Sequence, residues 1–166
     1  MVALDPTKPC QAIVSPCTIN PMRIVDVIAD AWGWKGVCPS ALVLQNAFGN
    51  LIFLDEHGQY WRICPEELSC EIVATNEEHF AKLQNTSEFI EDWTMRELVE
   101  RAQSAFGLLH PDRCYCLKIP AVLGGAYTLA NIGTIDRAEL ISFSGDVAKQ
   151  VKDLPDGAQV RFRITD

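Results

Sequence analysis

Hydrophobic and polar positions follow a helical period most clearly between residues 95 and 106. The apolar residues of this stretch recur at helical spacing and form one stripe: Met95, Leu98, Val99, Ala102, Ala105 and Phe106. Gly107 follows the stripe, as glycine commonly follows the end of a helix. Thr94-Met95-Arg96-Glu97 fits the capping box, in which a Thr and a Glu three residues later satisfy free backbone N–H groups. We therefore predict an amphipathic helix that is capped by Thr94 and stops at Gly107.

Four further stretches have helical signals, over residues 20–33, 75–83, 87–92 and 147–154. In the first, Asn20-Pro21 supplies a cap and a first helical residue, apolar side chains at helical spacing follow as far as Trp32, and Gly33 ends the helix. In the second, Thr75 or Asn76 is the cap. The last stretch is followed by Pro155-Asp156-Gly157, a sequence typical of turns.

Shorter runs of β-forming residues occupy two parts of the chain. Residues 41–44, 51–54 and 59–63, with 71–74 as a fourth run, are separated by turn sequences such as Asp55-Glu56-His57-Gly58, which predicts an antiparallel meander. Further strands are expected at 114–120 and 130–135. At the end of the chain, Val160, Phe162 and Ile164 alternate strictly with polar residues, which indicates a strand with one solvated face.

Strand and helix blocks do not alternate regularly along the chain, so the predicted fold class is α+β. We expect a mainly antiparallel sheet, made of the central meander and the C-terminal strands, packed with several α-helices. A chain of 166 residues is long enough to bury a core as one domain. The expected organisation is a single domain over residues 1–166, with an N-terminal arm and helix in 1–40 and the core in 41–166.

The first thirty residues contain no basic start followed by an apolar run, and four prolines interrupt them. A signal peptide is therefore not expected, nor does any apolar stretch reach the length of a membrane span. These features favour a cytoplasmic location. The seven cysteines show no C-x-x-C spacing and no neighbouring His at metal-ligand spacing, so we interpret them as buried thiols in a reducing compartment.

The chain offers little that catalysis would require. Its three histidines, His57, His79 and His110, lie in predicted turns or on a glutamate-rich helix, and no nucleophile signature accompanies them. Adjacent acidic residues fall at turns and helix starts, where they favour the helix dipole. We therefore expect no enzymatic activity, no cofactor and no metal.

The glycine pair Gly124-Gly125 raises the question of an anion-binding loop. The Walker loop requires a lysine after its second glycine, and the dinucleotide loop requires three glycines between a strand and a helix; this stretch has neither. Pro120 before the pair and β-type residues after it suit a corner between strands. A loop exposed for contact is the alternative interpretation.

Negative charge is concentrated in one part of the chain. The net charge is −8, and residues 51–100 contain twelve acidic and three basic residues, a net charge of −9. Such a segment repels phosphate backbones, so direct binding of nucleic acid is not expected. It can attract a basic partner, or it can serve solubility alone.

Three segments in this order resemble the type VI secretion immunity family related to DNase-immunity proteins, whose domain often follows a GAD-like region. They are NAFGNLIFLDEHGQYWRICPEEL (46–68), CYCLKIPAVLGGAYTLANIGTID (114–136) and SGDVAKQVKDLPDG (144–157), and the pattern covers residues 42–164. The resemblance implies inhibition by binding: such a protein covers the active site of a toxin delivered by related bacteria. It also implies that the glycine pair belongs to the fold.

A toxin that cuts DNA is basic where DNA lies, and clustered carboxylates can imitate phosphates there. Exposed aromatic residues within such a surface are typical of binding sites, which suggests a tryptophan anchor. We therefore predict that the partner-binding surface contains Glu66, Glu67, Glu71, Glu77, Glu78, Glu91 and Asp92, with Trp93 as the anchor. Two alternatives stay open: an immunity protein against a NAD-hydrolysing or ADP-ribosylating toxin, and a small ligand-binding module without a defensive role.

Overall fold

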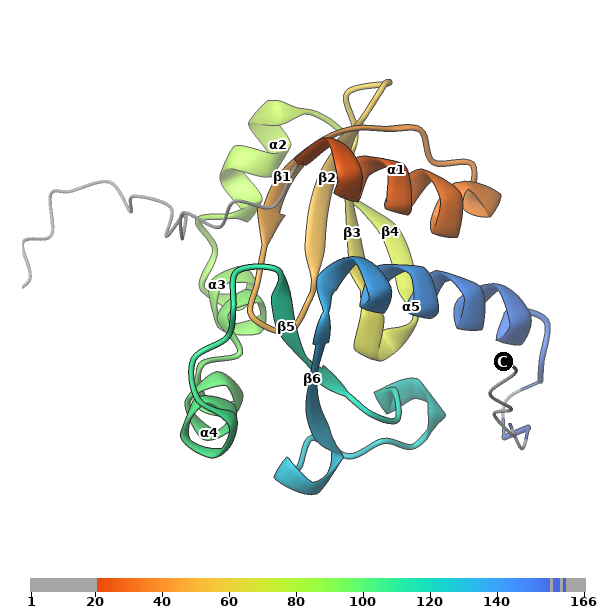
Figure 1. The fold of residues 1–166 in the computed structure, drawn as a ribbon. Coiled ribbons are helices and arrows are strands. Elements are labelled where there is room, and N and C mark those ends of the chain that lie inside the picture. Colours follow the sequence, from red (N-terminus) through yellow and green to blue (C-terminus); the bar gives the residue numbers. More distant parts are fainter. Residues whose placement is uncertain (1–20, 156, 159, 161–166) are drawn as a thin grey trace, which may run out of the picture.

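The computed structural model describes residues 21–155, 157, 158 and 160, and it has the predicted α+β class (Figure 1). A four-stranded antiparallel sheet has the order β1-β2-β3-β4, which confirms the meander. Its strands are β1 (Pro39–Gln45), β2 (Leu51–Asp55), β3 (Tyr60–Cys64) and β4 (Ser69–Ala74). A separate antiparallel pair consists of β5 (Arg113–Leu117) and β6 (Ile132–Asp136). The expected N-terminal arm, the Asn20 cap and, except for Val160, the final strand over 159–164 lie outside the described residues.

The helices are α1 (Pro21–Trp32), α2 (Glu77–Leu83), α3 (Ser87–Thr94), α4 (Arg96–Phe106) and α5 (Arg137–Val151). Short 3-10 turns precede β1 and β4 (η1, Gly33–Lys35; η2, Pro65–Glu67) and interrupt the β5–β6 connection (η3, Ala121–Leu123; η4, Leu129–Asn131). The last helix is longer than predicted, because it begins directly after β6, where the Asp136 carboxylate accepts a hydrogen bond from the N–H of Glu139. None of the helices in the described part of the chain is long and apolar enough to span a bilayer.

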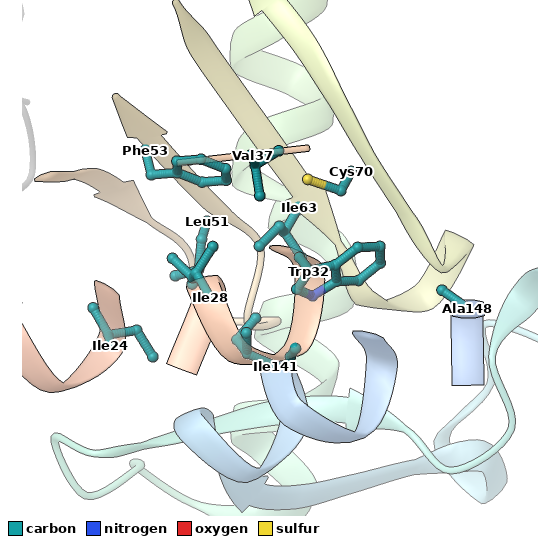
Figure 2. Packing of buried hydrophobic residues seen from close by; sticks show 11 residues of the cluster. Ile24, Ile28, Trp32, Val37, Leu51, Phe53, Ile63, Cys70, Ile141 and Ala148 are labelled. Carbon is teal, nitrogen blue, oxygen red and sulfur yellow. The ribbon is translucent and has the colours of Figure 1, made fainter. Parts of the chain in front are cut away.

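One face of the four-stranded sheet packs against α1 and α5, which lie side by side (Figures 1 and 2). Alternate strand residues such as Leu51 and Phe53 point into this core, where they meet Trp32 at the end of α1. The two helices approach closely at Gly145, since a Cβ at that position would lie 2.5 Å from the main-chain oxygen of Ala31. A glycine is therefore needed for this helix crossing.

The opposite face of the sheet packs against α2 and α3. Ile52 and Ala74 are fully buried on this side and contact Phe80 of α2. The rings of Tyr60 and Phe80 stack with their centroids 4.3 Å apart, an arrangement that fixes α2 on β3. Tyr60 thus lies beneath α2, and Arg62, two residues further along β3, reaches Asp92 of α3.

A third cluster joins α4 to the β5–β6 pair and contains Met95, Leu98, Val99 and Ala102 of the predicted apolar stripe, whereas Ala105 and Phe106 are exposed. Ala102 is fully buried there beside Phe48 and Tyr115, whose rings lie 5.6 Å apart. The Tyr115 hydroxyl donates a 2.7 Å hydrogen bond to the carbonyl of Gly107, the residue that ends α4. The predicted helix and its stop are therefore confirmed.

The predicted capping box at the start of α4 is wrong. Thr94 is the last residue of α3, and its hydroxyl donates to the carbonyl of Ile90 at 2.8 Å instead of accepting from the next helix. Met95 connects the two helices in the left-handed conformation, with φ of 44°, and α4 begins at Arg96 without a side-chain cap. The helix α3 extends two residues beyond its predicted end, so it includes Thr94, the residue that was predicted to cap α4.

The Gly124-Gly125 pair lies in the connection between β5 and β6, as the corner interpretation predicts. Gly124 has a φ of 90°, in the left-handed region that favours glycine. A Cβ on Gly125 would lie 1.8 Å from the main-chain oxygen of Ile119, which no side chain permits. Both glycines are therefore required by the path of the chain.

Candidate partner-binding surface

The predicted surface residues differ in their accessibility. Seven of the eight reach the solvent: Glu67, Glu71, Glu77, Glu78, Glu91 and Asp92 are exposed, and Trp93 is half-buried. Glu66 is only 6% exposed, so its carboxylate is not presented to a partner. The structure thus separates two glutamates that are adjacent in the sequence.

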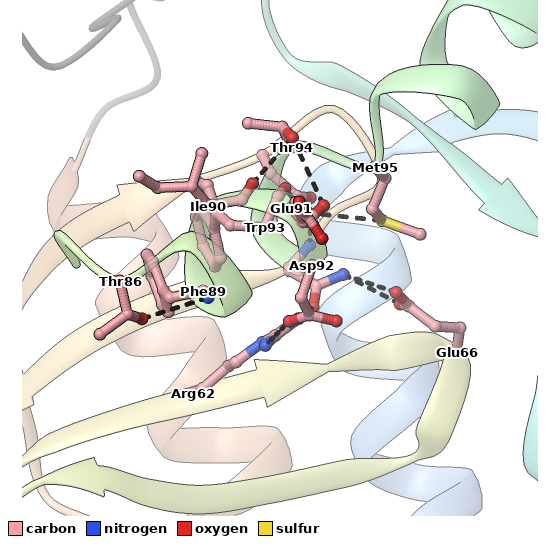
Figure 3. Close-up of polar contacts among 12 residues, drawn as sticks. Arg62, Glu66, Thr86, Phe89, Ile90, Glu91, Asp92, Trp93, Thr94 and Met95 are labelled. Atoms are coloured by element: carbon pink, nitrogen blue, oxygen red, sulfur yellow. Dashed lines mark hydrogen bonds and ion pairs between the residues drawn. The ribbon is translucent and has the colours of Figure 1, made fainter. Parts of the chain in front are cut away.

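Arg62 of β3 contacts two of the predicted surface residues, Asp92 and Trp93 (Figure 3). The β3–β4 register places Arg62 opposite Glu71, and its guanidinium forms an ion pair with Asp92 of α3. The guanidinium carbon also lies 5.6 Å from the centroid of the Trp93 ring, which is within the range of a cation–π contact. Sequence reasoning did not identify Arg62, because its partners in α3 are thirty residues away along the chain.

The inner side of Arg62 is connected to the buried Glu66 through one amide. Arg62 Nε and Nη2 donate to Asn50 Oδ1 at 3.1 and 2.8 Å. Asn50 Nδ2 in turn donates to both Glu66 carboxylate oxygens, at 2.8 and 3.0 Å, and Asn50 is fully buried. Burial raises the pKa of the Glu66 carboxyl, and the hydrogen bonds from Asn50 oppose that shift. Glu66 therefore has a structural role in this chain of contacts.

Trp93 is held on several sides within the fold. Its ring stacks on Phe89 with the centroids 5.7 Å apart, and Asn46 Nδ2 donates to its carbonyl at 2.9 Å. The Phe89 stack lies within α3, whereas the Asn46 hydrogen bond and the Arg62 contacts attach α3 to the end of β1 and to β3. The Trp93 ring is available to a partner only over the part that these neighbours leave exposed.

Of the remaining carboxylates, Glu91 lies on α3, and the others lie near the two ends of β4. Glu77 and Glu78 form the first turn of α2, where the Asn76 side chain caps the helix by accepting from His79 N–H at 2.9 Å. Acidic residues in this position are favoured by the helix dipole. Glu67 lies before β4, in η2, and accepts a 2.9 Å hydrogen bond from the Tyr127 hydroxyl. Because a six-residue strand is roughly 20 Å long, the two groups cannot contact the same partner side chain.

Residues 74–148 match a protein family described as T6SS immunity protein Tdi1, C-terminal. This match supports the resemblance to type VI secretion immunity proteins that the sequence segments indicate. The chain is also similar to the crystal structure of Atu4351 from Agrobacterium tumefaciens, with a TM-score of 0.53 and 19% sequence identity. That similarity covers 77% of this chain and 65% of the Atu4351 chain, and it is a similarity of fold. A search of curated proteins finds no match.

The immunity-family match covers only part of the candidate surface. It begins at Ala74, the last residue of β4, and ends in α5 at Ala148. The acidic residues of α2 and α3 and the whole β5–β6 connection are inside it. Arg62 and Glu71 precede the matched region, so the contacts that hold α3 on the sheet combine residues inside and outside it.

The possible catalytic groups of the described residues are dispersed. His57, His79 and His110 are exposed. Burial raises the pKa of Cys70 and Cys114 to about 12, and at such values the thiols are not nucleophiles at neutral pH. Among the described residues no group of three or more His, Cys, Asp or Glu has the arrangement of a metal site. Cys10 and Cys17 lie outside the described residues.

Proposed function

We propose that this chain is an immunity protein that binds a type VI secretion toxin, that the toxin is a DNase, and that an acidic surface on α2, α3 and β4 occludes its active site. The match to the immunity family supports a toxin as the partner. The observation that carries the rest is the exposure of six of the seven predicted carboxylates. This acidic surface consists of Glu71, Glu77, Glu78, Glu91 and Asp92, with Glu67 at its margin.

A carboxylate surface suits a DNase because an enzyme that binds DNA presents positive charge where the phosphates lie. The acidic surface does not require much reorganisation, since its α3 side is fixed on the sheet by Arg62. Arg62 is itself paired with Asp92, so its charge does not oppose a basic partner. Complementary charge of this kind mainly accelerates association.

Charge reversal in α2 tests the proposal directly. We expect Glu77→Lys/Glu78→Lys to slow association at low salt by at least tenfold and to flatten its salt dependence, because both residues are exposed in the first turn of α2. The probe is the C-terminal domain of the protein encoded directly upstream of this chain, which the proposal takes to be the toxin, with its active site inactivated, and association is measured by biolayer interferometry. Asp26→Lys/Asp30→Lys is the matched control, because these exposed residues lie on α1, across the sheet from α2, and the net charge changes equally.

The active form of the same toxin domain distinguishes the toxin classes. We expect it to degrade plasmid DNA and to be stopped by an equimolar amount of this chain. Hydrolysis of NAD, or transfer of ADP-ribose, with intact DNA would replace the DNase proposal by the second class of toxin. If wild-type chain and toxin domain do not bind, the proposed function is wrong as a whole.

A further inference from the structure

Exposed apolar side chains are concentrated in the connection between β5 and β6. Of the eleven large hydrophobic residues that are exposed in the described part of the chain, four lie between positions 119 and 129. They are Ile119, Val122, Tyr127 and Leu129, which are 50%, 56%, 40% and 41% exposed and which we call the loop patch. Single exposed apolar residues are ordinary, but several on one short segment are typical of interaction sites.

The loop patch is carried by a connection whose backbone is fixed. The Asn131 side chain accepts from Ile119 N–H and donates to the carbonyls of Ile119 and Ala126, each at 3.0 Å. Lys118 N–H donates to the Asn131 carbonyl at 2.7 Å, and Gly125 allows the Ile119 carbonyl to approach. A segment that is held in this way loses little conformational entropy when it binds, which favours tight contact. The connection is thus both a corner and an exposed loop.

The loop patch borders negative charge. The Tyr127 hydroxyl donates to Glu67, whose carboxylate remains exposed, and burial together with Glu67 and Glu66 raises the pKa of Tyr127. A small crevice lined by Glu66, Pro120 and Phe143 continues from the connection toward α5, and Phe143 is 43% exposed at that point. A partner that covers the patch must therefore place a positive group near Glu67.

We propose that the loop patch is the apolar anchor of the toxin interface, and that it docks on an apolar depression of the toxin with a lysine or arginine opposite Glu67. This inference rests on the proposed function, since it takes the same toxin as the partner. Glu67 is the residue that connects the patch to the acidic surface. Charged residues bring the two proteins together, whereas buried apolar and tyrosine contacts determine how slowly they separate.

The test measures dissociation of the toxin domain from patch variants. We expect Val122→Ser/Leu129→Ser to weaken binding at least tenfold, mainly through faster dissociation, and to leave the salt dependence unchanged. Both side chains are exposed, so the substitutions should leave the fold intact, and thermal unfolding verifies this. Leu108→Ser is the matched control, because Leu108 is 88% exposed outside the patch. Tyr127→Phe removes only the hydroxyl that donates to Glu67, so we expect a smaller loss of affinity than in the double variant.

The outcomes separate this inference from the proposed function. Suppose that the wild-type chain binds the toxin domain, that Glu77→Lys/Glu78→Lys weakens this binding, and that the patch variant binds as the wild type does. This result would overturn the loop patch as an anchor but would leave the acidic surface as the proposed binding site. A dimer of the isolated chain that dissociates in the patch variant, with toxin binding unaffected, would assign the patch to self-association and also overturn the inference. If wild type does not bind the toxin domain, both proposals fail together.

Discussion

The hydrogen bonds between Asn50 and Glu66 should be among the most important polar contacts for stability. Asn50→Ala removes the amide that donates to both oxygens of the Glu66 carboxylate, at 2.8 and 3.0 Å, and Glu66 is only 6% exposed. A hydrogen bond to a charged group contributes about 1.5–3 kcal/mol, and removing one partner of a buried charge costs about 3–5 kcal/mol. We expect a loss of about 4 kcal/mol in the free energy of unfolding, or about 10 °C in Tm.

The pH dependence of this loss identifies its cause. The folded-state pKa of Glu66 is raised by burial, and loss of Asn50 should raise it further. For such a group, stability is fully present below the unfolded pKa and is lost as the pH rises through the folded pKa. The penalty of Asn50→Ala should therefore be small near pH 4 and reach its full size near pH 8.

Urea unfolding followed by circular dichroism, at several pH values, measures the effect. In the Asn50→Ala background, Glu66→Gln should restore about 2 kcal/mol at pH 8, because the buried group is then neutral. The control is Asn85→Ala, which changes an exposed amide in the turn after α2 and should have a small penalty without this pH dependence. A penalty for Asn50→Ala that is equal at all pH values, and that Glu66→Gln does not relieve, would refute the reasoning.

Further predictions concern the attachment of α3, the corner and the thiols. Arg62→Met should cost about 2–3 kcal/mol, because it removes a partly exposed ion pair, a cation–π contact and both hydrogen bonds to the buried Asn50 amide oxygen, and Arg62→Lys should cost less, as measured by urea unfolding. Gly125→Ala should cost more than about 3 kcal/mol, because its Cβ would lie 1.8 Å from a main-chain oxygen and the chain would have to shift, whereas Gly33→Ala meets nothing within 4 Å and should change Tm little. Peptide mapping after brief exposure to a maleimide at pH 7 should find exposed Cys38 labelled and buried Cys70, with its pKa of about 12, protected. Equal labelling of both thiols would contradict the burial argument.

Elements that depend on local signals were predictable from the sequence. The β2–β3 hairpin is an example, since the Asp55 side chain accepts from the N–H groups of His57 and Gln59, which is turn chemistry visible in the sequence. The helix α4 is another, because its buried face consists of apolar residues at regular spacing. In both cases the residues that determine the structure are neighbours along the chain.

The first half of α5 was missed because its buried face does not look hydrophobic. Arg137, Ser144 and Gly145 are all buried in it beside apolar residues, so the helical period of hydrophobicity is weak. Arg137 is buried because its Nη1 donates to the Asn46 carbonyl at 2.8 Å, and Gly145 because α1 passes close by. These reasons lie in distant parts of the chain and cannot be found in a local pattern.

The candidate surface was predictable in its charge but not in its contacts. Composition indicates that acidic residues between 51 and 100 are mostly exposed, and the structure agrees for most of them. It does not indicate that Glu66 points inward while Glu67 points outward, since that depends on Asn50, sixteen residues away. Likewise, the position of Asp92 depends on Arg62 and on the register of β3.

Rigid spacing between the acidic surface and the loop patch has a consequence for inhibition. Arg62 fixes α3 on β3, and Tyr127 connects the β5–β6 corner to Glu67 in η2, directly before β4, so both surfaces are attached to the β3–β4 part of the four-stranded sheet. If the toxin contacts both, its affinity depends on their separation as well as on each surface alone. Loosening α3 by Arg62→Met should then accelerate dissociation even though Arg62 need not contact the toxin, and its effect should not simply add to that of Glu77→Lys/Glu78→Lys. Additive effects of the two changes would mean that the α2 and α3 parts of the surface bind independently.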